Sequence, residues 1–174
     1  MFAHKFLTTA FGLLFLAAFF GCASIGEKPS SQGHPKRSPQ FDKPGFETFL
    51  DGKKLWVFKM PSPYWSDFLR QGELVKKATW VGDGPEGMTV QAPDNETLYE
   101  YVGRRDGFKI FPQKGGTVWV FMDPSPELDK FEDFNRFDAK VEAAGAGVHA
   151  STLWAVDQAT IDAYVRALDL PKFE

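Results

Sequence analysis

The sequence predicts an α+β protein with two pseudo-symmetric β-β-α-β-β-α repeats packed into one domain. Short aromatic and β-branched runs alternate with helical patterns along the chain, and the same runs return in the same order in its second half. We therefore expect an antiparallel sheet with helices. Residues 45–106 form repeat 1 and residues 107–174 form repeat 2 in this prediction.

The repetition rests on residues that recur at a nearly constant spacing. The clearest pairs are Phe46 and Phe108, Trp56 and Trp119, Pro63 and Pro126, Phe68 and Phe131, and Tyr101 and Tyr164. A half of this size buries little apolar surface on its own. We therefore expect the two halves to share one core and to unfold together.

The first strands of repeat 1 are predicted to form a hairpin. Residues 46–50 and 54–59 are rich in aromatic and β-branched side chains, and Asp51-Gly52 lies between them. An Asp-Gly pair between two such runs favours a tight turn, because glycine tolerates a positive φ. Trp56, which is kept in both halves, is expected in the core.

The helices are predicted from their capping residues. Ser62 and Ser125 are each followed by proline, a pattern typical of a helix start, and Asp94 and Asp157 are expected to cap the second helix of each repeat. The first helix of each repeat is expected to bury its apolar side chains, which are Trp65, Phe68, Leu69, Leu128, Phe131 and Phe134.

A glycine-rich loop at residues 82–87 separates two predicted strands, residues 77–81 and 88–92. Loops that cradle phosphate lead from a strand into a helix, whose N-terminus attracts the anion. This loop joins two strands, and its acidic Asp83 and Glu86 would repel phosphate. A turn built on glycines is therefore the better interpretation.

Few side chains are suited to catalysis or metal binding. The chain has one cysteine and three histidines, so we expect no catalytic constellation, metal site or cofactor. One alternative is a hydrolase that uses His149 with a carboxylate such as Asp83. The residues that we single out as candidate ligand contacts are Trp80, Trp154, Asp83, Glu86 and His149.

The N-terminal residues 1–21 are typical of a secretory signal peptide. Lys5 is followed by an apolar run that ends with Gly21 just before Cys22. Gly21-Cys22 resembles the lipobox of bacterial lipoproteins. The resemblance implies that the signal peptide is removed, that Cys22 is acylated and becomes the mature N-terminus, and that the lipid bilayer is a partner.

Two other interpretations of this segment stay open. The apolar stretch is long enough for an uncleaved anchor, and cleavage after Ala23 would release the protein. Within the lipoprotein resemblance, Ala23 after the cysteine implies the outer membrane, facing the periplasm. Residues 22–44 are rich in Pro, Ser, Gly and charge, which predicts a lipidated N-terminus followed by a disordered tether.

The hairpin at residues 51–58 and the turn at residues 84–89 resemble uncharacterised tandem segments of bacterial proteins. That resemblance implies architecture and no activity. The net charge of −3 disfavours nucleic acid as a partner. We therefore expect a non-catalytic envelope module that binds a protein, glycan or small ligand. The alternatives are an accessory or structural subunit of an envelope complex and, third, the hydrolase.

Overall fold

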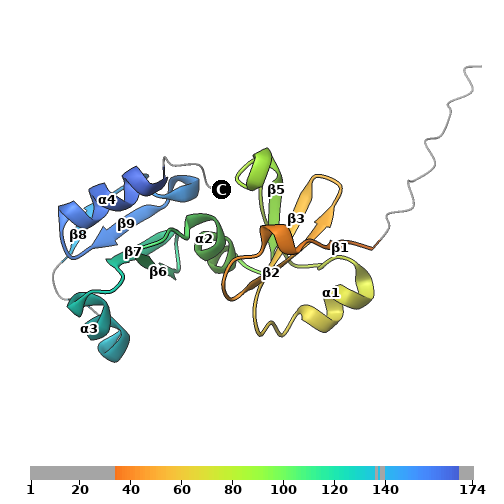
Figure 1. Ribbon diagram of the computed structural model, residues 1–174, viewed down its shortest axis with the longest axis horizontal. Coiled ribbons are helices and arrows are strands. Elements are labelled where there is room, and N and C mark those ends of the chain that lie inside the picture. The colour runs from red at the N-terminus through yellow and green to blue at the C-terminus, as the bar shows by residue number, and fades with distance from the viewer. Residues whose placement is uncertain (1–33, 136, 138–139, 169–174) are drawn as a thin grey trace, which may run out of the picture. The chain divides into compact units, whose positions relative to one another are not determined.

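Two mixed β-sheets and four α-helices make up the part of the chain that the computed structural model describes, residues 34–135, 137 and 140–168 (Figure 1). These residues belong to one compact unit. The predicted α+β class is confirmed. The predicted signal peptide and the predicted lipidation site, Cys22, lie outside the described residues.

The first sheet has the strand order β1-β2-β3-β5-β4. Its strands are β1 (Lys36–Arg37), β2 (Phe46–Asp51), β3 (Lys54–Lys59), β4 (Ala78–Trp80) and β5 (Thr89–Ala92). Helix α1 (Trp65–Gln71) follows the β2–β3 hairpin, and helix α2 (Asn95–Gly103) follows β5. The predicted hairpin and the glycine loop between β4 and β5 are both confirmed.

The second sheet has the strand order β6-β7-β9-β8. Its strands are β6 (Phe108–Gln113), β7 (Thr117–Met122), β8 (Val141–Ala143) and β9 (Thr152–Ala155). Helix α3 (Pro126–Phe134) follows β7, and helix α4 (Gln158–Leu168) follows β9. Short 3₁₀ turns are η1 (Pro39–Phe41), η2 (Pro85–Gly87) and η3 (Val148–Ala150).

The predicted antiparallel sheet is found in part: there are two sheets, mostly antiparallel, and each contains one parallel pair. Strand β5 runs parallel to β3 and pairs Gln91 with Trp56, while β9 runs parallel to β7 and pairs Trp154 with Trp119. In each case a helix and an edge strand lie between the two paired strands in the sequence. Such a crossover returns the chain in its original direction, as parallel pairing requires.

Alternate residues of β3 enter two different hydrophobic clusters. Leu55 and Val57 belong to a central core that also contains Val118 and Val120 of β7. Trp56 and its neighbour Phe58 point to the opposite face and pack with α1. This alternation follows from the two-residue period of a strand. The central core therefore contains residues of both sheets.

The helix ends agree with the predicted caps in three of four cases. The side chains of Asp94, Asp157 and Ser125 each accept a hydrogen bond from a backbone N–H three residues later. Helix α1 instead begins at Trp65, and Ser62 accepts a hydrogen bond from the N–H of Tyr64. Two apolar residues predicted to be buried, Leu69 and Phe134, are exposed.

The segment before β2 is ordered from residue 36, although the sequence predicted a disordered tether through residue 44. Strand β1 pairs with β2, and Arg37 donates to Asp42 with an Nη1–Oδ1 distance of 2.8 Å. Asp42 Oδ1 also accepts hydrogen bonds from the backbone and hydroxyl of Thr48, both at 2.9 Å. The order thus comes from polar contacts with the strand that follows this segment.

The pKa of Asp42 reflects these contacts. Burial would raise it, but the hydrogen bonds from Arg37 and Thr48 and the nearby guanidinium charge together hold the pKa below its usual value. The carboxylate is therefore the favoured form in the folded state.

Two buried tyrosines make similar hydrogen bonds in the two halves. The Tyr101 hydroxyl donates to the carbonyl of Phe41 at 2.6 Å, and the Tyr164 hydroxyl donates to the carbonyl of Gly103 at 2.7 Å. Each acceptor lies shortly before the first long strand of its half. Burial raises the pKa of both hydroxyls, so both remain protonated donors.

Arg105 connects the ends of helices α2 and α4. Its Nε donates to the carbonyl of Ala167 at 3.0 Å, and its Nη1 donates to the carbonyl of Val102 at 3.0 Å. Burial lowers the pKa of the guanidinium below its usual value. The contacts satisfy carbonyls at helix C-termini, where a cation is favourable.

Candidate functional site

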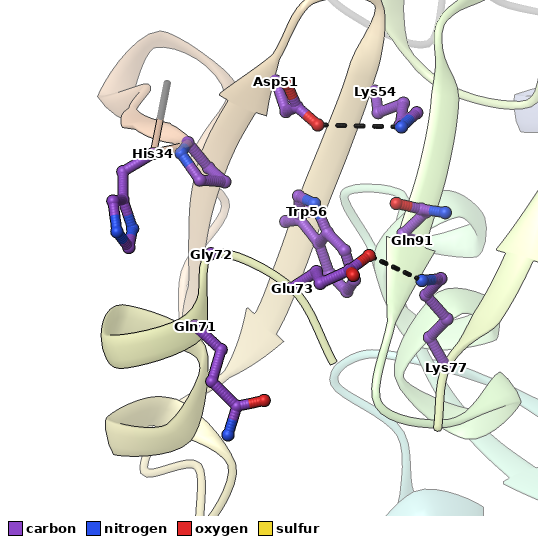
Figure 2. A pocket seen from close by; sticks show the side chains of 10 residues that line it. His34, Asp51, Lys54, Trp56, Gln71, Gly72, Glu73, Lys77 and Gln91 are labelled. Carbon is purple, nitrogen blue, oxygen red and sulfur yellow. Dashed lines mark hydrogen bonds and ion pairs between the residues drawn. The ribbon is translucent and has the colours of Figure 1, made fainter. Parts of the chain in front are cut away.

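A pocket of about 140 Å³ opens in the first half of the molecule, beside Trp56 (Figure 2). Strands β2, β3 and β5 contribute Asp51, Lys54 and Gln91. The end of α1 and the loop after it contribute Glu73 and Lys77, among others. The remaining lining residues are His34, Pro35, Gln71 and Gly72.

The indole N–H of Trp56 is a buried donor that has no hydrogen-bond partner in the described part of the chain. The side chain is 1% exposed, and its ring packs against Phe58 and Phe68 with centroid distances of 6.3 and 5.0 Å. The aromatic faces are thus covered, although Trp56 also lines the pocket. A buried unpaired donor is unusual in proteins and calls for an explanation.

Two ion pairs flank the pocket. Lys54 Nζ lies 3.7 Å from Asp51 Oδ2, and Lys77 Nζ lies 3.2 Å from Glu73 Oε2. The Lys77 ammonium also lies 5.5 Å from the centroid of the Trp56 ring. In Figure 2 the two pairs lie on different sides of Gln91. The two lysines and the two acidic residues together have a net formal charge of zero.

Gln91 forms the wall opposite the helix end. It is buried, and its amide nitrogen donates to the hydroxyl of Thr79 at 3.2 Å. Figure 2 shows the amide oxygen turned to the side of Trp56. Because β3 and β5 pair in parallel with Trp56 opposite Gln91, the register of the sheet fixes these two side chains next to each other.

Gly72 ends α1 with a left-handed φ of 77° and lets the chain approach the pocket closely. A Cβ atom at this position would lie 3.3 Å from His34 Nδ1 and 3.3 Å from Pro35 Cδ. Glycine is therefore favoured here both by its backbone conformation and by the space that the N-terminal segment occupies.

Three of the residues predicted as ligand contacts lie together, away from this pocket. His149 Nδ1 is 3.2 Å from Asp83 Oδ2, and the imidazole stacks on Trp80 with a centroid distance of 4.3 Å and an interplanar angle of 5°. Trp80 is buried rather than partly exposed, and its indole N–H donates to Asn95. The contact joins the first half of the chain to the second.

An imidazole beside a carboxylate has the geometry of a general base. The serine closest to His149 in sequence, Ser151, has a buried hydroxyl without a hydrogen-bond partner among the described residues, so it is not hydrogen-bonded to the imidazole. His149 itself is exposed. The arrangement therefore resembles a contact between halves more than a catalytic centre.

The other two predicted contacts, Glu86 and Trp154, lie apart from this group. Glu86 is an exposed turn residue with a φ of 53°. The indole of Trp154 donates to Glu142 at 2.9 Å, and the Lys140 ammonium lies over its ring. None of the five predicted contact residues lines the Trp56 pocket. Within the described ranges, no three His, Cys, Asp or Glu side chains lie close enough to hold a metal ion.

Sequence reasoning missed the pocket because its residues each had a simpler explanation. Trp56 was expected in the core, and Asp51 was expected in a turn. Comparing the halves would have given a signal, since Gln91 in β5 occupies the register position that Trp154 holds in β9. A polar residue opposite a buried tryptophan marks a place where the core is left unfilled.

Comparison with protein-family models, curated proteins and solved structures found no match for this chain. Among the residues that the structure describes, none of the helices has both the length and the apolar character needed to cross a membrane.

Proposed function

We propose that this protein is a lipid-anchored envelope module that binds a small polar ligand without chemical conversion. The observation that carries the proposal is the buried, unpartnered N–H of Trp56 beside a pocket with charged walls. Leaving such a donor unpaired costs about 1–3 kcal/mol. A ligand that supplies an acceptor would recover this free energy on binding.

The proposed anchor is Cys22, acylated after removal of residues 1–21. The basic start, the apolar run and the Gly21-Cys22 pair support it. With Ala23 after the cysteine, we place the protein at the outer membrane, facing the periplasm. Mass spectrometry of the mature N-terminus should show an acylated cysteine, and a chain that begins unmodified at Ser24 would contradict the proposal.

We also propose that the two halves are copies of one β-β-α-β-β-α unit related by a pseudo-two-fold axis. Three observations support this: the strand orders correspond, the paired registers place Trp56 and Trp119 alike, and two tyrosines make matching hydrogen bonds. The proposed repeats then begin a few residues earlier than 45, because the Phe41 carbonyl takes part in the first of these bonds.

A hydrolase is the second candidate, and the contact between His149 and Asp83 favours it. It predicts an activity that is abolished by His149→Ala while the Trp56 pocket is intact. An accessory role in an envelope complex is the remaining alternative, with an envelope protein or glycan as the partner. Capture of a stoichiometric partner that still binds a Trp56→Phe variant would favour that role over ligand binding.

The binding proposal can be tested on the intact lipoprotein in detergent micelles. The chain has five tryptophans, so the indole N–H resonance of Trp56 can be assigned and the other four serve as internal controls. We expect at least one member of a panel of sugars, polyols, amines, organic acids and amino acids to shift this resonance saturably.

The matched variants are Trp56→Phe, which removes the donor, and Trp119→Phe, which makes the same change in the second half. Isothermal calorimetry measures binding to both variants, because the first lacks the Trp56 resonance. Binding should be weakened about ten-fold or more in the first variant and kept in the second. If no member of the panel shifts the Trp56 resonance, the pocket is not a ligand site and the binding proposal is wrong.

A further inference from the structure

We infer that the ligand of the Trp56 pocket is a small zwitterion that carries a carboxylate and an ammonium group on one carbon, as a free α-amino acid does. This inference rests on the proposed binding function and specifies its ligand class. Size, charge and hydrogen-bond character of the pocket each restrict the ligand.

The size restricts the ligand to a few heavy atoms. The pocket measures about 140 Å³. An apolar cavity of roughly 150 Å³ holds one benzene molecule, which has six heavy atoms. Glycine, alanine and serine fall close to this size, whereas a hexose ring with its hydroxyl groups is about twice as large.

The hydrogen-bond donors of the pocket favour a ligand that carries an acceptor. The Trp56 indole can only donate, and its N–H has no hydrogen-bond partner among the residues that the structure describes. Lys54 and Lys77 bring two ammonium groups to the same pocket. A carboxylate is the acceptor that gains from all three donors, because hydrogen bonds between a donor and a charged acceptor are about twice as strong as neutral ones.

The balance of charge calls for a cation on the same ligand. Asp51 and Glu73 line the pocket with the two lysines, so a lone anion would be attracted by the two ammonium groups and repelled by the two carboxylates. An ammonium group beside the ligand carboxylate finds these oxygens and the amide oxygen of Gln91, which Figure 2 shows on the Trp56 side. A neutral ligand would form no ion pair with the charged side chains that line the pocket.

The side chains of the two ion pairs are exposed enough to pair with a charged ligand instead of with each other. Lys54 and Asp51 lie 3.7 Å apart with side chains 48% and 27% exposed, and Glu73 is 68% exposed. Exposed pairs of this kind contribute little free energy. A zwitterion can therefore bind one charged side chain of each ion pair, and little free energy is lost when these pairs separate.

A sugar fits the observations less well. Sugars commonly stack on the exposed face of an aromatic ring, but the ring of Trp56 is covered by Phe58, Phe68 and the Lys77 ammonium. The indole N–H is the polar group of this ring, and it is buried. The second half also lacks the charged wall, because the hairpin pair Asp51–Lys54 is replaced by Gln113–Thr117 at the same register position.

The test is a titration of the intact lipoprotein, followed at the Trp56 indole resonance. The probes are glycine and serine, together with two matched compounds that each lack one charge. N-acetylglycine keeps the carboxylate without the ammonium, and glycinamide keeps the ammonium without the carboxylate. Glucose is the neutral probe. We expect dissociation constants for glycine or serine at least about ten-fold lower than for the other three.

Variants test which side chains of the pocket contact the ligand and its charged groups. Because Trp56→Phe removes the reporting resonance, the variants are titrated by isothermal calorimetry. Trp56→Phe should raise the dissociation constant about ten-fold or more, whereas Trp119→Phe should leave it unchanged. Asp51→Asn should narrow the preference for glycine over N-acetylglycine. A headgroup probe, glycerophosphoserine, distinguishes a free amino acid from a lipid-borne one, and the zwitterion inference holds for either.

Tight binding of glucose, or equal binding of glycine and N-acetylglycine, would overturn the zwitterion inference and leave the binding function standing. If neither these probes nor the wider panel shift the Trp56 resonance, both proposals are overturned.

Discussion

The two halves of the molecule differ most at one pair of positions in their sheets. In the first half Trp56 lies opposite Gln91, and a pocket opens beside it. In the second half Trp119 lies opposite Trp154, and the two indoles pack edge to face with a centroid distance of 5.4 Å. The comparison shows that the same register can support a filled core or an open site, depending on one side chain.

The hairpins of the two halves also differ, in the charge of the residues at their turns. The first turn has Asp51 and Lys54 at its base, whereas the second has Gln113 and Thr117. The second half folds without a charged pair here, so the fold does not require one. The charges of the first half are therefore available for ligand binding.

The largest expected effect comes from removing the tryptophan that both halves share. Trp56→Ala and Trp119→Ala should each cost about 3–5 kcal/mol of unfolding free energy, as other large-to-small changes in cores do. Because the central core contains residues of both sheets, each variant should still unfold in one transition. Urea unfolding followed by far-UV and near-UV circular dichroism checks this, and two separate transitions would show that the halves are independent.

The N-terminal segment should matter nearly as much. A chain that begins at Gly45 loses β1, the Arg37–Asp42 pair and the carbonyl that accepts from Tyr101. We expect it to be less stable by about 3 kcal/mol than a chain that begins at His34, since each lost hydrogen bond contributes roughly 1 kcal/mol. Equal melting temperatures would show that the segment contributes nothing to folding.

Exchanging Gln91 and Trp154 between the halves should open the packing beside Trp119 and fill the pocket beside Trp56. Trp154→Gln should expose Trp119 to acrylamide quenching and cost about 1–2 kcal/mol, because the edge contact and the indole hydrogen bond to Glu142 are lost. Gln91→Trp should close the pocket, with overpacking of about 1–3 kcal/mol.

For the reciprocal exchange, fluorescence quenching and unfolding are measured on both single variants and on the double variant. If Trp154→Gln leaves the quenching of Trp119 unchanged, the second half has closed by other contacts and the comparison fails.

Acid should destabilise the first half through Asp42. The folded-state pKa of this carboxyl is lowered, so its contribution is present above the unfolded pKa of about 3.9 and is lost as the pH falls through the folded value. Asp42→Asn should therefore cost about 1–3 kcal/mol near pH 6 and much less near pH 2. Unfolding measured at both pH values checks this, and a cost that is independent of pH would contradict it.

The smallest expected effect is shared by the two halves. Tyr101→Phe and Tyr164→Phe each remove one buried hydrogen bond, which should cost about 1 kcal/mol in either half. Thermal unfolding of the two variants should give similar shifts. A much larger loss for one of them would mean that the two hydroxyl contacts are not equivalent.

The sequence predicted what depends on neighbouring residues. Asp94, Asp157 and Ser125 cap helices because their side chains reach N–H groups three residues away, and this geometry is local. Ser62 has the same signal but does not cap, because α1 begins later, where Trp65 packs on Phe49 and Phe58. Packing between distant segments decided against the local pattern.

The candidate site depended on contacts that the sequence does not display. The pocket forms where β3 and β5 pair in parallel and the end of α1 approaches His34, and neither contact follows from composition. Similarly, Asp42 orders its segment through Thr48, which belongs to a later strand. The contact between Asp83 and His149 was raised as a hypothesis, but its stacking on the buried Trp80 was not.

One consequence follows from the position of His34 at the rim of the pocket. An extended chain covers at most about 3.6 Å per residue, so the segment from Cys22 to His34 spans no more than about 43 Å. With acyl chains on Cys22, the pocket mouth would be confined to a layer of that depth along the bilayer. The protein would then bind its ligand only within that layer, which small solutes reach by diffusion.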